Sequence, residues 1–197
     1  MSRLDRLVAE LASTPPLVSD DPALRQAAVA VMLAPDPDQL LVIRRTERAG
    51  DPWSGHLALP GGRREPADAD LLHTAVRETA EEIGVVLDLA WWRATLDDLA
   101  PHTPVLPPLV VRPFVFQLPA GVEAALSNEV AVAQWVPFEW FAQPGVFRSL
   151  ALESRGQRFQ APGYQLDHGF LWGMTERIVT PMVRRWIALG GISTASS

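Results

Sequence analysis

Three glutamates, Glu78, Glu81 and Glu82, lie within five residues of one another in this chain. Residues three and four apart are neighbours on the surface of a helix, so a helix would make Glu78 a like-charge neighbour of the other two. In a partly buried cleft, two unit charges about 4 Å apart repel each other by about 4 kcal/mol. A divalent cation removes this repulsion, and Mg²⁺ or Mn²⁺ suits such a group of carboxylates. The cluster therefore indicates a metal site, and with it phosphate chemistry.

A glycine pair, Gly61 and Gly62, precedes the glutamates by a polar loop. Paired glycines allow the backbone to approach a ligand closely and to adopt positive φ angles. The alternative interpretation of the glutamates is a solvated helix face, because glutamate is a good helix former. The glycine loop favours a site over that alternative. Gly62 is a candidate to offer its backbone carbonyl to the metal, although a simple turn would also explain it.

The glutamates lie in a segment that predicts an amphipathic helix. Leu72, Val76, Thr79 and Ile83 share one stripe of the helical wheel, which is the spacing of a core-facing helix. The three glutamates fall outside this stripe, so their replacement is not expected to disturb folding. Gly84 follows at a position where glycine commonly ends a helix.

These residues resemble the Nudix box. That motif reads Gly, five residues, Glu, seven residues and then Arg-Glu-aliphatic-any-Glu-Glu-any-Gly-aliphatic, and Gly62 and residues 77–85 resemble its two ends. The stretch between Gly62 and Arg77 is one residue longer than in the general motif. The upstream glutamate is absent, with Asp68 or Asp70 nearest to its place, and a threonine stands in the first aliphatic position.

Further segments resemble the coenzyme A pyrophosphatase branch of that superfamily. The resemblance covers roughly residues 25–188 and rests on the Pro-Gly-Gly loop followed by an aspartate, and on segments 40–45, 128–130, 134–137 and 171–178. Residues 51–57 differ from that branch, which usually has a His-x-Gly-Gln-Val segment there. The resemblance implies an α/β (α+β) fold, in which a Nudix-type mixed β-sheet is sandwiched between helices.

The resemblance also implies an enzyme, a pyrophosphohydrolase that uses Mg²⁺ or Mn²⁺. It assigns catalysis and metal binding to Glu78, Glu81 and Glu82. The implied reaction cleaves a diphosphate bond in a nucleoside diphosphate linked to another group, and coenzyme A would give 3′,5′-ADP and 4′-phosphopantetheine. Alternative substrates are ADP-ribose, dinucleotides and (oxidised) nucleoside triphosphates. A nucleotide-sensing Nudix module without activity is an alternative of another class.

Arginines are candidates for binding the substrate's phosphates, because the guanidinium fork matches phosphate oxygens. The candidates are Arg44, Arg45, Arg63 and Arg64. Since side chains alternate along a strand, only one of the first two is expected to serve. Arg77 precedes Glu81 by four residues, so we expect an ion pair between them that orients the cluster.

Four more side chains have two interpretations each. His56 and His102 flank the predicted site loops and could contact substrate, although a lone histidine is more often structural. Glu129 could add a metal ligand or a base, or be a solvated surface residue. Trp53 could stack on a nucleobase, but with seven tryptophans in the chain most serve packing.

The composition sets limits on the protein class. With 197 residues, 48% of them hydrophobic, the chain is expected to form one globular domain over residues 1–197. The formal charge of −6 argues against nucleic acid as a partner. There is no cysteine, which is compatible with the cytoplasm, our expected location. No apolar run approaches the ~20 residues that span a membrane, so we expect no membrane partner. The resemblance implies a nucleotide-type small molecule as substrate, and we allow for a homodimer.

The remaining patterns predict the elements that position these residues. Helices are expected at about residues 2–13, 138–147 and 168–189, the last kinked or split by Pro181. Strands are expected at 27–34, 40–45, 109–118 and 130–136, with a strand region over 85–99. Pro113 suggests that the strand over 109–118 is an edge strand or contains a bulge. A long loop is expected over 46–62, a hairpin or loop over 149–164 and a disordered tail over 190–197.

Overall fold

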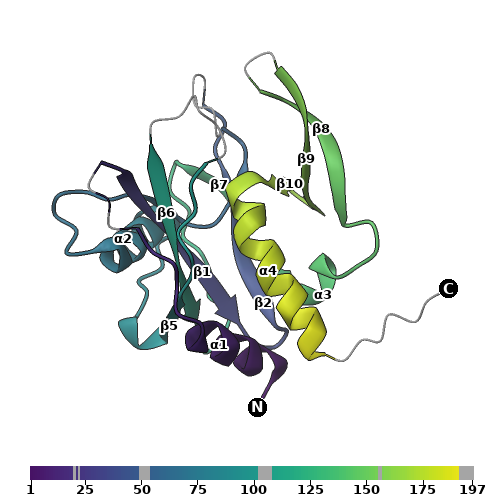
Figure 1. Cartoon of the computed structure of the whole chain (residues 1–197), viewed down its shortest axis with the longest axis horizontal. Coiled ribbons are helices and arrows are strands. Elements are labelled where there is room, and N and C mark those ends of the chain that lie inside the picture. The colour runs from purple at the N-terminus through teal and green to yellow at the C-terminus, as the bar shows by residue number, and fades with distance from the viewer. Residues whose placement is uncertain (20, 22, 49–53, 102–107, 155–156, 191–197) are drawn as a thin grey trace.

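The main element of the fold is a seven-stranded mixed sheet, in a computed structural model that describes residues 1–19, 21, 23–48, 54–101, 108–154 and 157–190 (Figure 1). Its strands are β1 (Arg25–Ala34), β2 (Gln39–Arg45), β3 (Leu57–Ala58), β4 (Gly61–Arg63), β5 (Trp92–Thr95), β6 (Leu109–Gln117) and β7 (Val130–Pro137). The order is β3-β2-β1-β6-β5, with β4 beside β1 and β7 beside β2. β1 and β6 run parallel, and the other pairs are antiparallel.

Helices cover both faces of this sheet (Figure 1). α2 (Leu71–Ile83) packs on one face, whereas α1 (Arg3–Ser13) and α4 (Gly173–Leu189) pack on the other, with α3 (Phe138–Phe141) against α4. The predicted architecture, a mixed sheet between helices, is therefore confirmed. α1 also lies where a helix was expected, and Ser2 caps it by accepting a hydrogen bond from the N–H of Asp5 (3.0 Å).

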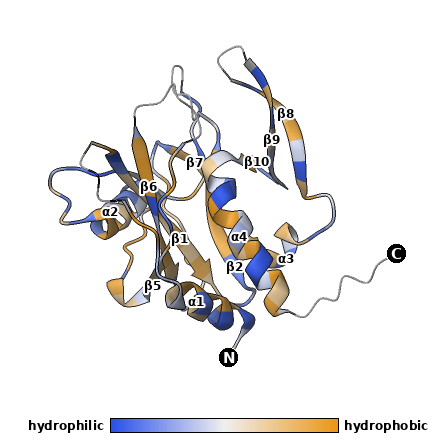
Figure 2. Cartoon of the chain, viewed as in Figure 1, coloured by the Kyte–Doolittle hydropathy of each residue, from blue (hydrophilic) through white to orange (hydrophobic). Residues whose placement is uncertain are grey.

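The central strands are buried on both faces, which explains their continuous apolar sequence. In β1, Ala30 and Met32 belong to the buried cluster beneath α2, while Val31 and Leu33 belong to the cluster beneath α1 and α4. Figure 2 shows hydrophobic strands inside and hydrophilic patches on the helices. The sheet thus separates two cores, and the helix that carries the glutamates rests on one of them.

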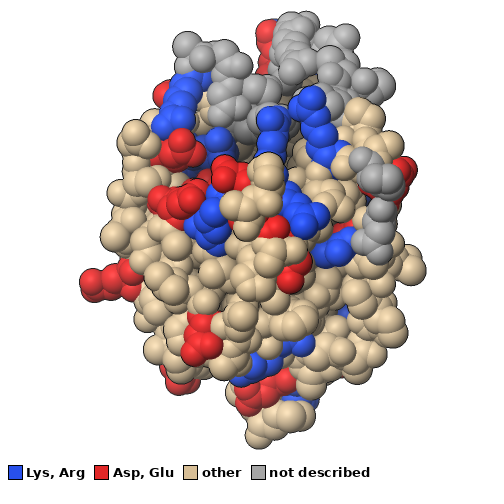
Figure 3. Space-filling view, turned by 90° about the vertical axis from the view of Figure 1, so that its left-hand side faces the viewer, with Lys and Arg blue, Asp and Glu red and all other residues tan. Residues whose placement is uncertain are grey.

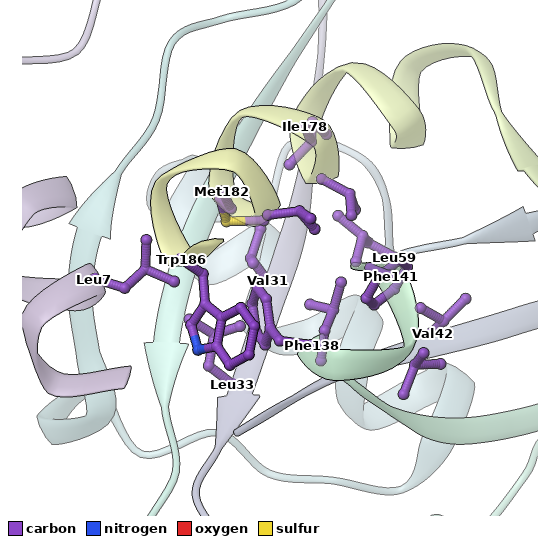
Figure 4. Packing of buried hydrophobic residues seen from close by; sticks show 14 of the residues in the cluster. Leu7, Val31, Leu33, Val42, Leu59, Phe138, Phe141, Ile178, Met182 and Trp186 are labelled. Atoms are coloured by element: carbon purple, nitrogen blue, oxygen red, sulfur yellow. The ribbon is translucent and has the colours of Figure 1, made fainter. Parts of the chain in front are cut away.

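α4 is anchored by Trp186, which is 1% exposed. Its ring stacks on Phe138 with a centroid distance of 5.4 Å, and its indole N–H donates to Asp38 (2.8 Å). Figure 4 shows both rings packed among apolar side chains from α1 and the strands, including Leu7 and Leu33. Burial of such apolar surface contributes about 25 cal/mol per Å².

Among the described residues, no helix combines the length and apolarity needed to cross a membrane.

A smaller antiparallel sheet follows the larger one in the chain. It consists of β8 (Phe147–Ser154), β9 (Gln157–Leu166) and β10 (Gly169–Trp172), with β9 in the middle. The hairpin expected over 149–164 is confirmed by the β8–β9 pair. The helix predicted from residue 168 is wrong in its first turn, because Gly169–Trp172 pairs with β9 and α4 begins at Gly173. α4 then continues through Pro181, so the proline does not split it.

Three other predicted elements differ from the structure. β6 is not an edge strand, because β1 pairs along one side of it and β5 along the other. The Pro113 carbonyl accepts a hydrogen bond from Leu96 N–H just after β5 ends, and the pairing resumes where Leu99 lies opposite Val111. The missing N–H of Pro113 therefore faces an irregular part of the pairing, which agrees with the expected bulge. The 85–99 region holds a short 3₁₀ turn, η1 (Leu89–Trp91), before β5. The helix expected over 138–147 ends at Phe141, since the chain joins β8 from Phe147.

Two short strands hold the glycine pair between β1 and β2. β3 pairs with the end of β2, and β4 pairs with the start of β1, where Gly62 lies opposite Ala28. Between them the Pro60 carbonyl accepts a hydrogen bond from the N–H of Ala30 (2.8 Å). α2 packs against both β1 and β4. The glycine strand is thus fixed directly beneath the helix that carries the glutamates.

Candidate active site

α2 begins and ends with clear signals in the sequence. The Asp70 carboxylate accepts a hydrogen bond from the N–H of His73 (2.9 Å) and caps the first turn. Gly84 ends the helix with a φ of 68°, the left-handed conformation that glycine adopts without strain. The helix boundaries therefore follow from local chemistry, as expected.

The buried face of α2 differs from the predicted stripe. Glu82 is only 3% exposed, whereas Leu72 and Val76 are only partly buried. The expectation that all three glutamates lie off the buried face is therefore wrong for Glu82. The physical reason lies across the interface, where β4 offers backbone without side chains at Gly61 and Gly62 and leaves room for a carboxylate.

Glu82 is held by a backbone amide and faces an arginine. Its Oε2 accepts a hydrogen bond from the N–H of Gly61 (2.9 Å), and its Oε1 lies 3.5 Å from Nη1 of Arg45. Burial raises the pKa of Glu82 to about 7, an effect that Glu78 and Glu129 reinforce and that Gly61 and Arg45 oppose. At neutral pH an added positive charge nearby would therefore stabilise the ionised form of this carboxylate.

Glu78 lies directly against Gly62. A methyl group on Gly62 would lie 2.4 Å from the carboxyl carbon of Glu78, a distance that no side chain can accept. Burial raises the pKa of Glu78 as well, against the attraction of Arg77. Gly61 has a separate constraint, since its φ is 151° and a methyl group there would meet the Ala28 carbonyl at 2.2 Å. The backbone therefore requires glycine at position 61, whereas a side chain at position 62 would displace the Glu78 carboxylate.

Replacement of Gly62 with alanine is expected to lower kcat by about 10- to 100-fold, because the Glu78 carboxylate must move and a displacement near 1 Å has effects of this size. The free energy of unfolding should change by less than about 1 kcal/mol, since Gly62 is not at a positive φ. Steady-state turnover and urea unfolding test both parts. Gly121→Ala is the control, and equal activity of the two variants would contradict the placement of Glu78.

Glu81 is the exposed member of the three glutamates and shares Nη1 of Arg77 with Glu78. It is 59% exposed, and its Oε2 accepts a hydrogen bond from Arg77 (2.9 Å), which confirms the expected ion pair four residues apart. Within the described parts of the chain, no three Asp, Glu or His side chains gather as a ready-made metal-ligand group. Glu82 is held at Gly61, whereas Glu78 and Glu81 both contact Arg77, and the expected metal-binding roles of the three glutamates stay predictions.

Arg77 has a stronger partner that the sequence only hinted at. Its Nε and Nη2 donate to the two carboxylate oxygens of Asp68 at 2.9 and 3.0 Å. Asp68 is buried and also accepts hydrogen bonds from Thr74 and from the N–H of Glu65, and the bonds from Arg77 hold its pKa well below the usual range. Asp68 is the sixth residue after Gly62, the position of the motif's missing glutamate. That offset was the signal that could have identified it.

Arg77 also joins this ion pair to the glycine strand. Its Nη2 donates to the Arg63 carbonyl (3.0 Å), and its Nη1 lies 3.1 Å from Glu78 Oε1. One guanidinium therefore binds the loop aspartate, the backbone beside Gly62 and a glutamate of α2. Asp68 positions Arg77, and Arg77 positions Glu78.

Replacement of Asp68 with asparagine is expected to lower the free energy of unfolding by about 2 kcal/mol, because it weakens two charged hydrogen bonds to Arg77, whose other acidic partners Glu78 and Glu81 remain. Urea unfolding of D68N measures this. Asp70→Asn is the matched control, since asparagine caps a helix as well as aspartate does. Equal stability of the two variants would show that the Asp68–Arg77 pair does not hold the loop.

The four candidate phosphate arginines are placed differently. Arg45 lies beside Glu82, while Arg44 turns to Glu47 (2.7 Å), as strand alternation predicts. Arg64 donates to Gln26 (3.0 Å) and to the carbonyls of Asp68 and Ala69, and Arg63 contributes its carbonyl to Arg77. Of the four, the structure brings Arg45 to the glutamates. The phosphate-binding roles of the other three stay predictions.

The remaining candidates lie at the margins of this site. The His56 ring packs edge-on against Trp172 with a centroid distance of 5.1 Å. Glu129 forms an ion pair with Arg48 (3.2 Å), and Arg48 was not among the residues predicted from the sequence. The negative charge of Glu129 also helps to raise the pKa of Glu82. His102 and Trp53 lie outside the described residues.

The donor set fits a hard divalent cation. Glu78 and Glu82 supply carboxylate oxygens, and a side chain at Gly62 would fill the space beside Glu78. Both carboxylates have raised pKa values because of burial, so a cation would relieve an unfavourable charge at neutral pH. On the side of the molecule that carries α2, basic and acidic side chains lie next to each other in the upper half (Figure 3). This arrangement can hold a cation and the anion that the cation binds.

Comparison with known proteins gives the family. The model of the NUDIX domain matches residues 24–153. A Nudix hydrolase NudL of Photorhabdus laumondii is 28% identical over 184 residues, which are 92% of this chain and 95% of that protein. A protein of Schizosaccharomyces pombe is 35% identical over 145 residues, 62% of this chain, and the match spans 44% of the yeast protein's length.

Solved structures share the fold. A MutT/nudix family protein from Enterococcus faecalis has a TM-score of 0.60 at 18% identity, and the match covers 95% of this chain and 70% of that one. A bifunctional NMN adenylyltransferase/ADP ribose pyrophosphatase from Francisella tularensis, complexed with AMP and a manganese ion, has a TM-score of 0.54 at 14% identity, covering 93% and 46%. With the family model matched over most of the sheet and α2, the chain belongs to the Nudix family of pyrophosphohydrolases.

Proposed function

We propose that the protein hydrolyses the diphosphate bond of a nucleoside diphosphate linked to another group, with coenzyme A or its derivatives preferred. The products would be 3′,5′-ADP and 4′-phosphopantetheine. The observation that carries the proposal is the pair of carboxylates, Glu78 and Glu82, set against the bare backbone of Gly61 and Gly62. Two acids held together in this way favour a bound cation, and a cation beside an arginine favours a diphosphate.

In the proposed mechanism Glu78 and Glu82 would hold Mg²⁺ or Mn²⁺, with the Gly62 carbonyl and Glu81 as further candidates. The bound cation would polarise a phosphoryl oxygen and lower the pKa of a water molecule. Arg45, beside Glu82, would neutralise charge on the diphosphate. A carboxylate of the site accepts the proton of the attacking water, one P–O bond forms and the bridging P–O bond breaks. No covalent enzyme intermediate is needed.

The manganese ion in the Francisella tularensis structure supports Mn²⁺ as one of the two candidate metals. The choice of coenzyme A rests on the resemblance of segments 40–45, 128–130, 134–137 and 171–178, since the name of the NudL relatives states no substrate. The substrate is therefore the part of the proposal that most needs a direct experiment.

A product analysis over coenzyme A, ADP-ribose, NADH and nucleoside triphosphates, each with Mg²⁺ and Mn²⁺, tests the proposal. We expect metal-dependent release of 3′,5′-ADP and 4′-phosphopantetheine from coenzyme A. Turnover of ADP-ribose or a dinucleotide without turnover of coenzyme A would exclude coenzyme A as the substrate but would still support diphosphate hydrolysis. Monophosphate with diphosphate from a nucleoside triphosphate would indicate a triphosphate-sanitising enzyme. Tight nucleotide binding without hydrolysis of any compound would indicate a sensor module.

A further inference from the structure

A groove of about 510 Å³ lies beside the glycine strand, and residues 24–26 and 63–66 line it. Three of these residues are arginines, Arg25, Arg63 and Arg64, and one is an acid, Glu65. The whole chain has a formal charge of −6, whereas the charged residues that line this groove have a net positive charge. The groove therefore favours an anion.

Two of the three arginines have no acidic partner. Arg64 is occupied, because it donates to Gln26 and to two backbone carbonyls. For Arg25 and Arg63, none of the residues that the structure describes forms a side-chain hydrogen bond or ion pair. Other arginines near the site are paired: Arg44 with Glu47, Arg48 with Glu129, Arg77 with Asp68 and Arg112 with Asp98.

The strand register places these two side chains on one face. Arg63 of β4 lies opposite Ala27 of β1, and Arg25 lies two residues before Ala27, so both point to the same side of the sheet. Arg64 and Gln26 point to the other side, as their hydrogen bond shows. Like charges on neighbouring strands repel each other unless an anion lies between them. A dianion that both guanidinium groups contact would remove that repulsion.

The groove begins one residue from the catalytic carboxylates. Arg63 follows Gly62, which touches Glu78, and consecutive Cα atoms are about 3.8 Å apart. The Arg63 carbonyl is itself bound by Arg77. Because its side chain leaves β4 on the opposite face from Gly62, Arg63 is better placed for a group next to the diphosphate than for the diphosphate itself.

We propose that Arg25 and Arg63 form a subsite for a second phosphate of the substrate, a phosphomonoester on the ribose of the nucleoside. Such a group carries a charge near −2 at neutral pH and three acceptor oxygens, enough for two guanidinium forks. The proposal of this subsite rests on the proposed diphosphate hydrolysis at Glu78 and Glu82. It restricts the substrate to nucleotides that carry a phosphate on the ribose. Coenzyme A has this phosphate at the 3′ position, whereas ADP-ribose and NADH lack it.

The test compares substrates that differ only in this phosphate: coenzyme A with dephospho-coenzyme A, and NADPH with NADH. For R25Q/R63Q we expect kcat/KM to fall about 10- to 100-fold for the phosphorylated member of whichever pair is hydrolysed, the range of a lost charged hydrogen bond, and to stay within about twofold for the other member. Arg6→Gln, which removes an exposed arginine of α1, is the control. An equal fall for both members would overturn the subsite, as would a wild-type enzyme that does not distinguish them.

A binding measurement separates the subsite from the hydrolysis. Calorimetry with adenosine 3′,5′-bisphosphate and with AMP requires no turnover. We expect the wild-type protein to bind the bisphosphate about tenfold more tightly, and R25Q, R63Q and the double variant to lose that difference. If no compound is hydrolysed but this pattern holds, the proposed reaction fails and the subsite stands. If the wild type binds both compounds equally, the subsite fails whatever the protein hydrolyses.

Discussion

E82Q is expected to lower kcat by roughly 10²- to 10³-fold, the range seen when one electrostatic group at a reacting centre is removed. Glu82 is buried, and the N–H of Gly61 fixes the position of its carboxylate. Glutamine keeps its size and can still accept the Gly61 N–H, and the loss would therefore reflect charge. Metal-dependent turnover of the best substrate measures it.

Two comparisons make that result specific. Glu10→Gln removes an exposed carboxylate from α1 and should leave kcat unchanged. Glu81→Gln should cause a smaller loss than E82Q, because Glu81 is 59% exposed and turned toward Arg77. Wild-type activity of E82Q, with the protein folded by circular dichroism, would rule out Glu82 as a metal ligand.

The same substitution is expected to stabilise the metal-free protein at alkaline pH. Burial raises the pKa of Glu82 from 4.5 to about 7. The folded state therefore keeps a proton that the unfolded chain releases, and stability falls as the pH rises from about 4.5 to 7 and stays low above it. A difference of 2.5 pKa units at 1.36 kcal/mol each corresponds to at most about 3 kcal/mol.

Urea unfolding in a metal chelator, at pH 5 and pH 8, tests this. We expect E82Q to exceed the wild type by about 2–3 kcal/mol at pH 8 and by much less at pH 5. Mg²⁺ should then stabilise the wild type more than E82Q. An equal difference between the two proteins at both pH values would mean that ionisation of Glu82 is not the cause.

Features set by neighbouring residues could be predicted from the sequence. The Arg77–Glu81 pair follows from helical spacing, and the left-handed Gly84 follows from the way helices end. The strands β1 and β2 follow from apolar runs that both faces of a sheet can bury. Each of these features depends either on contacts between residues close in the sequence or on the burial of apolar side chains.

Features set by distant contacts could not be predicted. The burial of Glu82 depends on the bare glycine backbone more than twenty residues before it, since helical periodicity alone places Glu82 outside the core-facing stripe. The strand Gly169–Trp172 depends on pairing with β9, which overrides a helical pattern. Pro113 lies inside the sheet because the pairing with the segment after β5 is irregular beside it. In each case contacts with a segment distant in the sequence determined the local structure, and the local sequence pattern did not.

Arg77 has a consequence for how this enzyme can move. A single guanidinium contacts the loop at Asp68, the strand at Arg63 and the helix at Glu78 and Glu81. None of these three segments can shift without breaking bonds to the other two. Loop, strand and helix should therefore open together, with amide protons whose exchange reports one common free energy of opening. Any adjustment to substrates of different size must come from the segments outside this junction, which makes the reacting centre rigid and its surroundings adaptable.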